Sequence, residues 1–174
     1  MKKKIKEKLK NIKLILLDVD GVLTDGGIYI TNNGDEFKRF NVKDGSGIKM
    51  AIHSGLKVVF ITGRKSKIVM KRAEELNISE VYQGITQKHL FLDKIMKRFQ
   101  VKENEIAYIG DDVIDLQIMK RVGLKVAVKD AHILIKKIAD IITKKKGGEG
   151  AVREFIDILL KETGKWEDGY KRYL

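Results

Sequence analysis

Two acidic residues with the spacing of a catalytic pair stand near the start of the chain. Asp18 and Asp20 are one residue apart and directly follow the apolar run LILL at residues 14–17. A continuous apolar run of this kind is typical of a strand that is covered on both faces of a parallel sheet. The two carboxylates therefore stand where that strand ends. Carboxylates paired in this way can supply a nucleophile and a general acid.

A second group of polar residues follows another predicted strand. Residues 56–61 are mostly apolar, and Thr62, Gly63 and Arg64 come next. Their hydroxyl and backbone amide groups are suitable donors to an anion such as phosphate. Because the carboxyl ends of parallel strands meet at one edge of a sheet, we expect this group to lie beside the first acidic pair.

Three more aspartates, Asp111, Asp112 and Asp115, follow a predicted strand at residues 106–109. Asp115 lies three to four residues beyond the other two and therefore on the same face of a helix. Five carboxylates gathered at one edge of a sheet repel each other unless a cation joins them. Because the ligands would all be oxygen atoms, Mg²⁺ is the metal that this set favours.

Each motif taken alone has a simpler interpretation. An Asp-x-Asp pair at a strand end is commonly a turn cap, and a Gly-Asp-Asp sequence commonly caps the start of a helix. We base the catalytic interpretation on the occurrence of all three groups in one chain, each after a strand. With Lys88 added as a cation, the set predicts a phosphate-binding site with a metal beside it.

The elements that must position these residues alternate between strands and helices. The predicted strands are residues 13–18, 28–30, 37–40, 56–61, 81–82, 106–109, 125–128 and 140–142. The predicted helices are residues 47–54, 66–76, 88–99, 113–122, 131–136 and 149–161. This alternation predicts right-handed βαβ units, and so an α/β fold of the Rossmann type, a three-layer sandwich with a mainly parallel sheet.

A single domain is expected for residues 1–174, because this length is ordinary for one compact unit. Asn32-Asn33-Gly34 separates two short strand-like runs and predicts a β-hairpin insertion at about residues 27–41. That hairpin and one helix nearly fill the segment between Asp18 and Thr62, so we expect no cap domain. The polar ends, residues 1–10 and 163–174, are expected to be peripheral. Trp166 and Tyr170 are candidates to dock the second of these ends on another subunit.

Composition narrows the class of protein. The chain has 36 basic and 24 acidic residues and a net charge of +12, but the two signs are interleaved and no aromatic-basic motif is present, so no nucleic-acid partner is expected. A basic balance can also draw small anionic substrates toward a cleft. The absence of cysteine fits a reducing, cytoplasmic location. No apolar run is long enough to span a bilayer, so no membrane association is expected.

The combined motifs resemble those of the haloacid dehalogenase superfamily. They are DVDGVLT at residues 18–24, Thr62 in ITGR, Lys88 in QKH and GDDVID at residues 110–115. Further segments, FNVKDGSGI, VYQG, VAVKDAH and GGEGAVRE, are similar to those of the 3-deoxy-D-manno-octulosonate 8-phosphate phosphatases. This resemblance covers roughly residues 13–160.

The resemblance implies a Mg²⁺-dependent phosphoric monoester hydrolase that acts through an aspartyl-phosphate. In such an enzyme Asp18 would be the nucleophile, and Asp20 would be the general acid and base. Asp18, the Asp20 carbonyl and Asp111 would hold Mg²⁺, while Thr62, Gly63 and Lys88 would bind the phosphate group. Asp112 and Asp115 would orient metal-bound waters and Lys88, and Asp20 and Arg64 would contact the substrate.

The resemblance further implies an eight-carbon acidic sugar phosphate as substrate, in lipopolysaccharide precursor synthesis, and a homotetramer whose hairpins meet at its centre. A phosphatase for a nine-carbon ulosonate 9-phosphate is the nearest alternative, because it would share every catalytic residue. Two alternatives from other classes stay open. A nucleic-acid-binding protein would be indifferent to Asp18→Asn, and a catalytically inactive scaffold would release phosphate from no ester.

Overall fold

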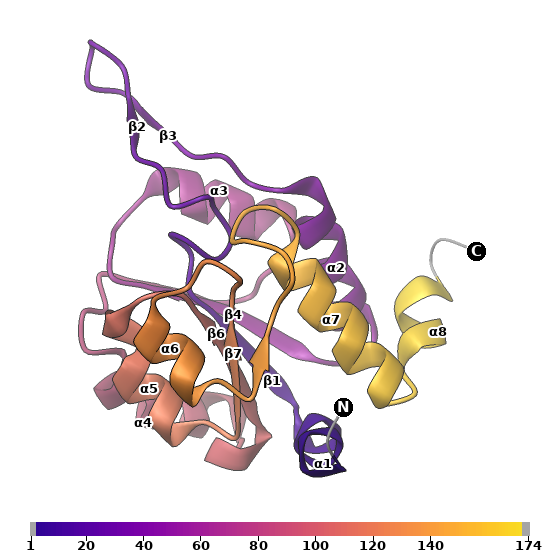
Figure 1. Cartoon of the computed structure of the whole chain (residues 1–174). Helices are drawn as coiled ribbons and strands as arrows, with labels where there is room; N and C mark the ends of the chain where they lie inside the picture. The colour runs from indigo at the N-terminus through magenta and orange to yellow at the C-terminus, as the bar shows by residue number, and fades with distance from the viewer. Residues whose placement is uncertain (1–2, 172–174) are drawn as a thin grey trace.

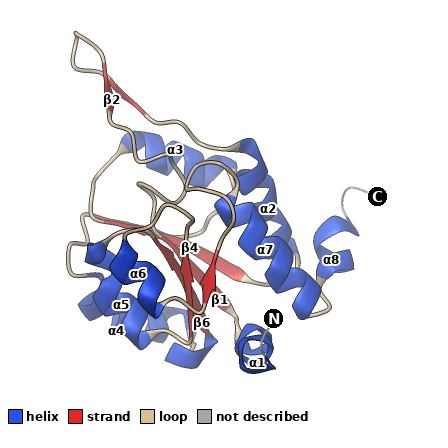
Figure 2. Cartoon of the chain, viewed as in Figure 1, coloured by secondary structure: helices blue, strands red, loops and turns tan. Residues whose placement is uncertain are grey.

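The computed structural model of the chain describes residues 3–171, which are built around one six-stranded sheet (Figures 1 and 2). Its strands are β1 (Leu14–Leu17), β4 (Lys57–Thr62), β5 (Val81–Gln83), β6 (Ile106–Gly110), β7 (Leu124–Ala127) and β8 (Ile141–Ile142). They are ordered β5-β4-β1-β6-β7-β8, and every neighbouring pair is parallel. The predicted fold class is therefore confirmed.

Strand β1 occupies the middle of the sheet because all four of its side chains are apolar and buried. Leu17 pairs with Phe60 of β4 on one side and with Ile109 of β6 on the other. The chain runs outward from β1 through β4 to β5 and then crosses back to β6, so the strand order changes direction at β1. A change of direction of this kind opens a crevice at the carboxyl ends of the strands. Asp18 lies at that crevice.

Helices cover both faces of the sheet (Figure 2). One layer contains α2 (Val42–His53), α3 (Lys67–Glu75) and α7 (Ala151–Glu162), and the other contains α4 (Lys88–Phe99), α5 (Leu116–Arg121) and α6 (Ile133–Ile138). Right-handed connections made in opposite directions along the sheet place their helices on opposite faces. Among the described helices, none is both long enough and apolar enough to cross a bilayer.

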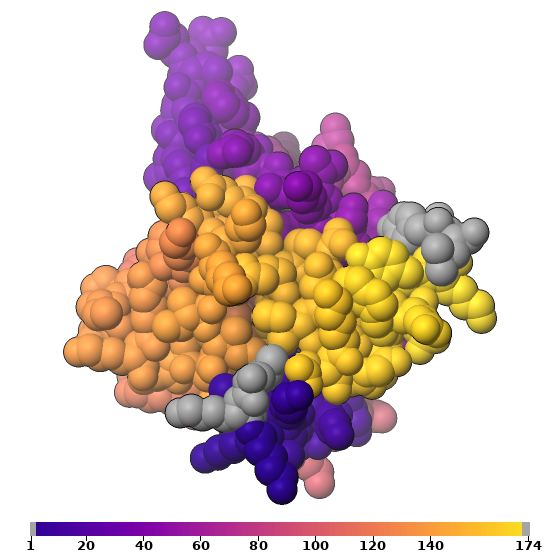
Figure 3. All heavy atoms as spheres, turned by 45° about the vertical axis from the view of Figure 1, so that its right-hand side comes forward, coloured from indigo at the N-terminus to yellow at the C-terminus, as the bar shows by residue number. Residues whose placement is uncertain are grey.

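A hairpin stands clear of the body of the molecule (Figures 1 and 3). It consists of β2 (Tyr29–Ile30) and β3 (Glu36–Phe37), which pair antiparallel, as predicted for this insertion. Gly34 takes a φ of +84° in its turn, a backbone conformation that glycine adopts without strain. The rings of Tyr29 and Phe37 stack with their centroids 4.9 Å apart across the two strands.

Two predicted helices differ from the structure by more than a shift of one or two residues at an end. Helix α2 begins at Val42 rather than at residue 47, because the Asn41 side chain accepts the Lys43 amide at 2.8 Å and caps the helix there. The helix predicted at residues 113–122 is divided into a 3₁₀ turn, η2 (Val113–Asp115), and α5. A second 3₁₀ turn, η1 (Glu103–Glu105), precedes β6.

The expectation that both ends are peripheral is wrong for three apolar residues, while residues 1–2 and 172–174 lie outside the described part of the chain. Leu9 of α1 (Lys3–Asn11) is buried in the core of the same chain. In α8 (Trp166–Tyr170), Trp166 and Tyr170 lie against each other with ring centroids 4.5 Å apart and pack against that core. Tyr170 also accepts a hydrogen bond from Arg153 of α7 at 2.8 Å. The aromatic pair therefore docks α8 on its own chain.

Candidate active site

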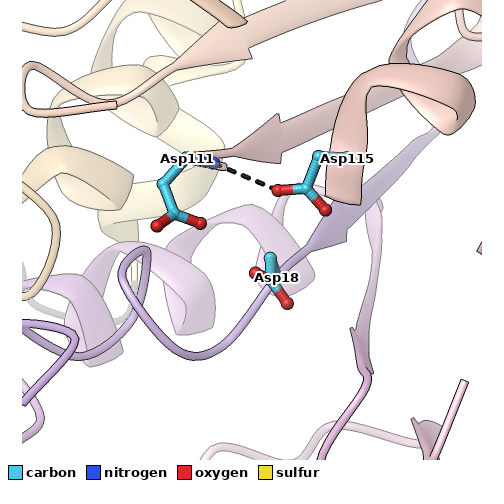
Figure 4. A group of neighbouring side chains, drawn as sticks. All are labelled: Asp18, Asp111 and Asp115. Atoms are coloured by element: carbon cyan, nitrogen blue, oxygen red, sulfur yellow. Dashed lines mark hydrogen bonds between the residues drawn. The ribbon is translucent and has the colours of Figure 1, made fainter. Parts of the chain in front are cut away.

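Asp18 directly follows β1 and is buried, with 3% of its surface exposed (Figure 4). Its backbone amide donates to the Ile109 carbonyl at 3.1 Å, so the sheet fixes its position. Its Oδ1 atom lies 2.7 Å from Nζ of Lys88. Burial and the charge of Asp115 raise the pKa of Asp18 to about 7, although Lys88 acts in the opposite direction. Ionisation of this carboxylate therefore requires nearby positive charge.

Asp111 follows β6 and faces Asp18 across the crevice (Figure 4). Its Oδ1 atom is buried and has no hydrogen-bond partner among the described residues. Burial and the charges of Asp18 and Asp115 raise the pKa of Asp111 to about 8. One carboxylate oxygen from each of these three residues lies within 4.8 Å of the others. An all-oxygen set with one unpartnered buried atom fits a hard divalent cation.

The loop after β1 passes very close to Asp111. Gly21 has a φ of +88°, and a Cβ atom at this position would lie 2.1 Å from Oδ2 of Asp111. A side chain at residue 21 would therefore displace either the loop or the carboxylate. Glycine is required here so that the loop carrying Asp18 and Asp20 can approach the acids after β6.

Lys88 is buried at the start of α4 within a network of polar groups. Its Nζ atom donates to Asp115 Oδ1 at 2.8 Å and to the Tyr108 hydroxyl at 3.0 Å. Tyr108 in turn donates to Asp115 at 2.6 Å. Burial alone would lower the pKa of Lys88, but the charges of Asp18 and Asp115 raise it. The ammonium is therefore held charged beside Asp18.

Sequence reasoning missed Tyr108. One signal was present, because a tyrosine in the otherwise apolar strand 106–109 needs a partner for its buried hydroxyl. Asp115 is buried, and its second oxygen accepts the Asp111 amide at 3.1 Å. Asp112 is exposed, and its side chain accepts the Val113 amide at 2.7 Å. Asp112 and Asp115 were expected to orient metal-bound waters and Lys88. The structure places Asp115 against Lys88, and Asp112 caps η2.

Thr62 ends β4 and is buried beside the crevice. Its Oγ1 atom accepts the Arg64 amide at 3.2 Å, so this amide, expected to donate to phosphate, has a partner within its own turn. The Arg64 side chain extends to the hairpin, where its guanidinium donates to Oε1 of Glu36 at 2.9 Å. Thr62 and Arg64 line a cleft of about 200 Å³. Its walls are formed by Asp18, Asp20, Thr62, Gly63, Arg64, Asp111, Asp112 and Ile114.

Asp20 lies in this cleft and is paired with Lys38, which follows β3. Lys38 also lies 3.4 Å from Glu36, measured from Nζ to Oε1. Sequence reasoning missed both Lys38 and Glu36. The sequence carries no signal for them, because charged residues on a hairpin usually face solvent.

The site and its setting together define a class of protein. In this parallel sheet the central strand β1 is followed by an Asp-x-Asp pair, β4 on one side of it ends in a threonine, and β6 on the other side is followed by acids. This is the arrangement of a haloacid dehalogenase-like hydrolase. The sequence profile of the haloacid dehalogenase-like hydrolases matches residues 77–156 of this chain.

Named relatives narrow this class. The 3-deoxy-D-manno-octulosonate 8-phosphate phosphatase of Escherichia coli (strain K12) is 48% identical over 161 residues, which are 92% of this chain and 86% of that protein. The crystal structure of the Yersinia pestis phosphatase of the same name has a TM-score of 0.93 and 44% identity, covering 95% of this chain and 89% of that one. This chain belongs to the family of 3-deoxy-D-manno-octulosonate 8-phosphate phosphatases.

A further solved structure carries ligands. The phosphatase of the same name from Moraxella catarrhalis, in complex with a magnesium ion, a phosphate ion and a KDO molecule, has a TM-score of 0.95 and 37% identity over the whole of both chains. The resemblance seen in the motifs is therefore confirmed, and the chain is a phosphatase.

Proposed function

We propose that this protein hydrolyses 3-deoxy-D-manno-octulosonate 8-phosphate to the free sugar acid and phosphate, with Mg²⁺ as its cofactor. The observation that carries the proposal is the convergence of Asp18 and Asp111 in one cleft, with the Lys88 ammonium paired to Asp18. The chain that carries this site is similar to named phosphatases over 92% of its length. The reaction would supply the sugar acid for lipopolysaccharide precursor synthesis.

The reaction begins when an Asp18 oxygen attacks phosphorus and the ester bond to the sugar breaks. Asp20 gives a proton to the departing sugar oxygen, which leaves as an alcohol. The product of this half is an aspartyl-phosphate on Asp18. In the second half Asp20 takes a proton from water, the water oxygen bonds to phosphorus, and Asp18 is released as a carboxylate together with inorganic phosphate.

The remaining residues stabilise negative charge during both halves. Lys88 and Thr62, with the backbone at Gly63, would hold the phosphate oxygens that do not leave. Mg²⁺ supplies positive charge that offsets the charge of the phosphate and of the acids around it. Asp18, the carbonyl of Asp20 and Asp111 would hold this ion.

Arg64 would bind the carboxylate of the sugar acid. Its side chain stands at the mouth of the cleft, and its guanidinium is paired with one carboxylate, Glu36, at 2.9 Å. The side chain is 44% exposed, so it is free to turn toward a second carboxylate. A bidentate contact between arginine and a carboxylate would add geometric selectivity for acidic sugars.

A homotetramer is the assembly that we propose. The projecting hairpin exposes three apolar side chains, with Ile28 60%, Ile30 65% and Phe37 53% exposed. Apolar side chains that gather on a projecting segment mark a surface for association. Because Arg64 at the cleft mouth is paired with Glu36 of the hairpin, a neighbouring subunit that packs on the hairpin would help to close the cleft around the sugar.

Phosphate release from purified protein tests the proposed function. The eight-carbon 8-phosphate and a nine-carbon ulosonate 9-phosphate are compared, each with Mg²⁺ and with a chelator. We expect Mg²⁺-dependent release and a higher kcat/KM on the eight-carbon ester. Preference for the nine-carbon ester would overturn the substrate assignment, and release from neither ester would overturn the reaction.

Replacement of the nucleophile gives the first prediction. Asp18→Asn removes the attacking oxygen's charge while keeping its size, and we expect kcat to fall by a factor on the order of a thousand or more. The matched control is Asp35→Asn, which changes an exposed carboxylate at the hairpin tip and should leave kcat unchanged. Normal turnover in the Asp18 variant would show that another residue attacks phosphorus.

A further inference from the structure

Lys38 makes an unusual contact for a hairpin residue. Its side chain is only 2% exposed although the hairpin projects into solvent, and its ammonium is paired with Asp20 and with Glu36. Glu36 also accepts from Arg64 at the cleft mouth. A chain of alternating charges therefore runs from the cleft mouth to the proposed general acid, in the order Arg64, Glu36, Lys38 and Asp20. Burying an ammonium is costly unless it is paired in this way.

The backbone sets the position of Lys38 relative to Asp20. Thr24 pairs with Phe40 in an isolated β-bridge, which joins the loop after β1 to the end of the hairpin. The Thr24 hydroxyl accepts the amides of Gly21 and Gly26, each at 3.2 Å, and so ties both ends of that loop together. The base of the hairpin and the Asp20 loop are thus one connected unit.

Asp20 has fewer polar partners than Asp115. Asp115 is held by the Lys88 ammonium, the Tyr108 hydroxyl and a backbone amide. Among the described residues, Lys38 is the one side chain that hydrogen-bonds Asp20. Lys38 itself is not part of the cleft wall, so its influence on the substrate would pass through Asp20.

We propose that Lys38 is a positioning residue for the reaction, which holds the Asp20 carboxyl group where it meets the departing oxygen of the ester. This inference rests on the proposed function and adds a residue of the hairpin to it. Without the ammonium, the Asp20 side chain would turn between rotamers, and a misplaced acid donates its proton poorly. The hairpin then has a role in the chemistry of its own subunit.

Leaving-group dependence tests this role directly. Lys38→Met and Lys38→Arg are compared with the unchanged protein on substituted phenyl phosphates, from 4-nitrophenyl to 4-methoxyphenyl phosphate. The value of kcat/KM reports the steps up to cleavage of the ester, and a nitrophenolate leaves without needing a proton. These esters contain no sugar, so a lost sugar contact cannot alter the comparison.

We expect Lys38→Met to lower kcat/KM by a few-fold on the nitrophenyl ester and by roughly tenfold to a hundredfold on the methoxyphenyl ester. General acid catalysis supplies about a hundredfold or more, and a misplaced acid would retain part of it. Lys38→Arg keeps the charge and should recover most of the loss. Arg39→Met, on the same hairpin and paired with Asp25, is the control and should match the unchanged protein. Equal losses on all the esters would overturn the proposal.

A double-mutant cycle shows whether Lys38 acts through Asp20. In a protein that already carries Asp20→Asn, adding Lys38→Met should change kcat/KM on the methoxyphenyl ester less than twofold. A further large loss would show a separate role and overturn the proposal. If Lys38→Met does not fold, Lys38→Gln takes its place in both experiments. A protein that hydrolyses no ester refutes the proposed function, whereas an active one with unchanged leaving-group dependence refutes this inference alone.

Discussion

The electrostatics of single residues explain why the site needs a metal. Asp18 and Asp111 are buried close to Asp115, and their pKa values rise to about 7 and about 8. A nucleophilic Asp18 must be ionised, and Lys88 is the one ammonium paired with it among the described residues. A bound divalent cation would favour the ionised form of the acids that surround it.

These raised values predict how the pH alters the stabilisation by Mg²⁺. In the unfolded chain Asp18 and Asp111 have the ordinary aspartate pKa of 3.8 and lose their protons near that pH. In the folded, metal-free protein both carboxyl groups keep their protons to higher pH. The unfolded state then binds fewer protons, so the stability of the metal-free protein falls as the pH rises from about 4 to about 8. Mg²⁺ should offset this loss.

The measurement is the melting temperature with saturating Mg²⁺ and with chelator, at several pH values. We expect the increase caused by Mg²⁺ to be small near pH 5 and to grow toward about pH 8. Asp111→Asn is the control, because it removes one of the two acids and should reduce the increase across the whole range. An increase that shrinks as the pH rises would contradict this account of the acid cluster.

At the scale of elements, the segment between β8 and α7 supports the loop that carries Asp20. The Gly148 amide donates to the Val22 carbonyl at 3.0 Å. Helix α7, which follows this segment, is held by Asp44 of α2, whose buried carboxylate accepts the amides of Gly150 at 3.2 Å and Arg153 at 2.8 Å. Burial raises the pKa of Asp44 to about 6. The glycines after β8 thus form a packed support rather than a free loop.

Gly147 offers a test of this support. A Cβ atom there would lie 1.7 Å from the Gly21 carbonyl oxygen, so Gly147→Ala must displace one of the two loops. We expect kcat for phosphate release to fall by roughly tenfold or more, because a small misplacement of catalytic groups is costly. Steady-state kinetics and thermal melting would be measured on the same preparation.

Gly150→Ala is the matched control for that variant. Gly150 has a φ of +100° but open space where its Cβ would stand, so alanine there brings backbone strain without a clash. It should lower stability by about 1 kcal/mol and leave kcat close to normal. If Gly147→Ala has normal kcat, the support is not needed for catalysis.

At the scale of the whole molecule, the hairpin would join the proposed assembly to the active site. The side chains of Ile28, Ile30 and Phe37 are exposed, while the neighbouring Lys38 is buried and contacts Asp20. The same hairpin therefore carries exposed apolar side chains and the contact with Asp20. Contacts between subunits would hold it in place.

Charge placed on the hairpin tests the proposed tetramer. In Ile28→Asp combined with Ile30→Asp, the carboxylates would be buried in an apolar contact, and we expect the assembly to dissociate. Light scattering after size exclusion gives the mass, and KM for the sugar phosphate should rise because the cleft loses its neighbouring wall. Leu90→Asp, which changes an equally exposed apolar side chain of α4, should alter neither value. An unchanged mass in the hairpin variant would exclude the hairpin as the assembly surface.

Much of the fold and the reaction class could be predicted from the sequence by itself. The apolar runs that became β1, β4 and β6 are continuous in the chain, and the acids at their ends are their immediate neighbours. Parallel strands align their carboxyl ends, so residues far apart in the chain meet without any detailed knowledge of packing. The order of elements along the chain and the identity of the residues after each strand were enough to indicate phosphoryl transfer.

The tertiary structure alone decided the contacts that depend on how separate elements approach each other. Asp112 and Asp115 differ little in sequence context, yet η2 turns Asp115 inward to Lys88 and leaves Asp112 in solvent. Lys38 and Asp20, which pair in the structure, are 18 positions apart in the sequence. Asp44 lies 106 and 109 positions before the two residues whose amides it accepts, Gly150 and Arg153. Such contacts depend on the hairpin's direction and on the packing between helices. Local sequence patterns do not encode either of these, because the same patterns recur in every amphipathic element.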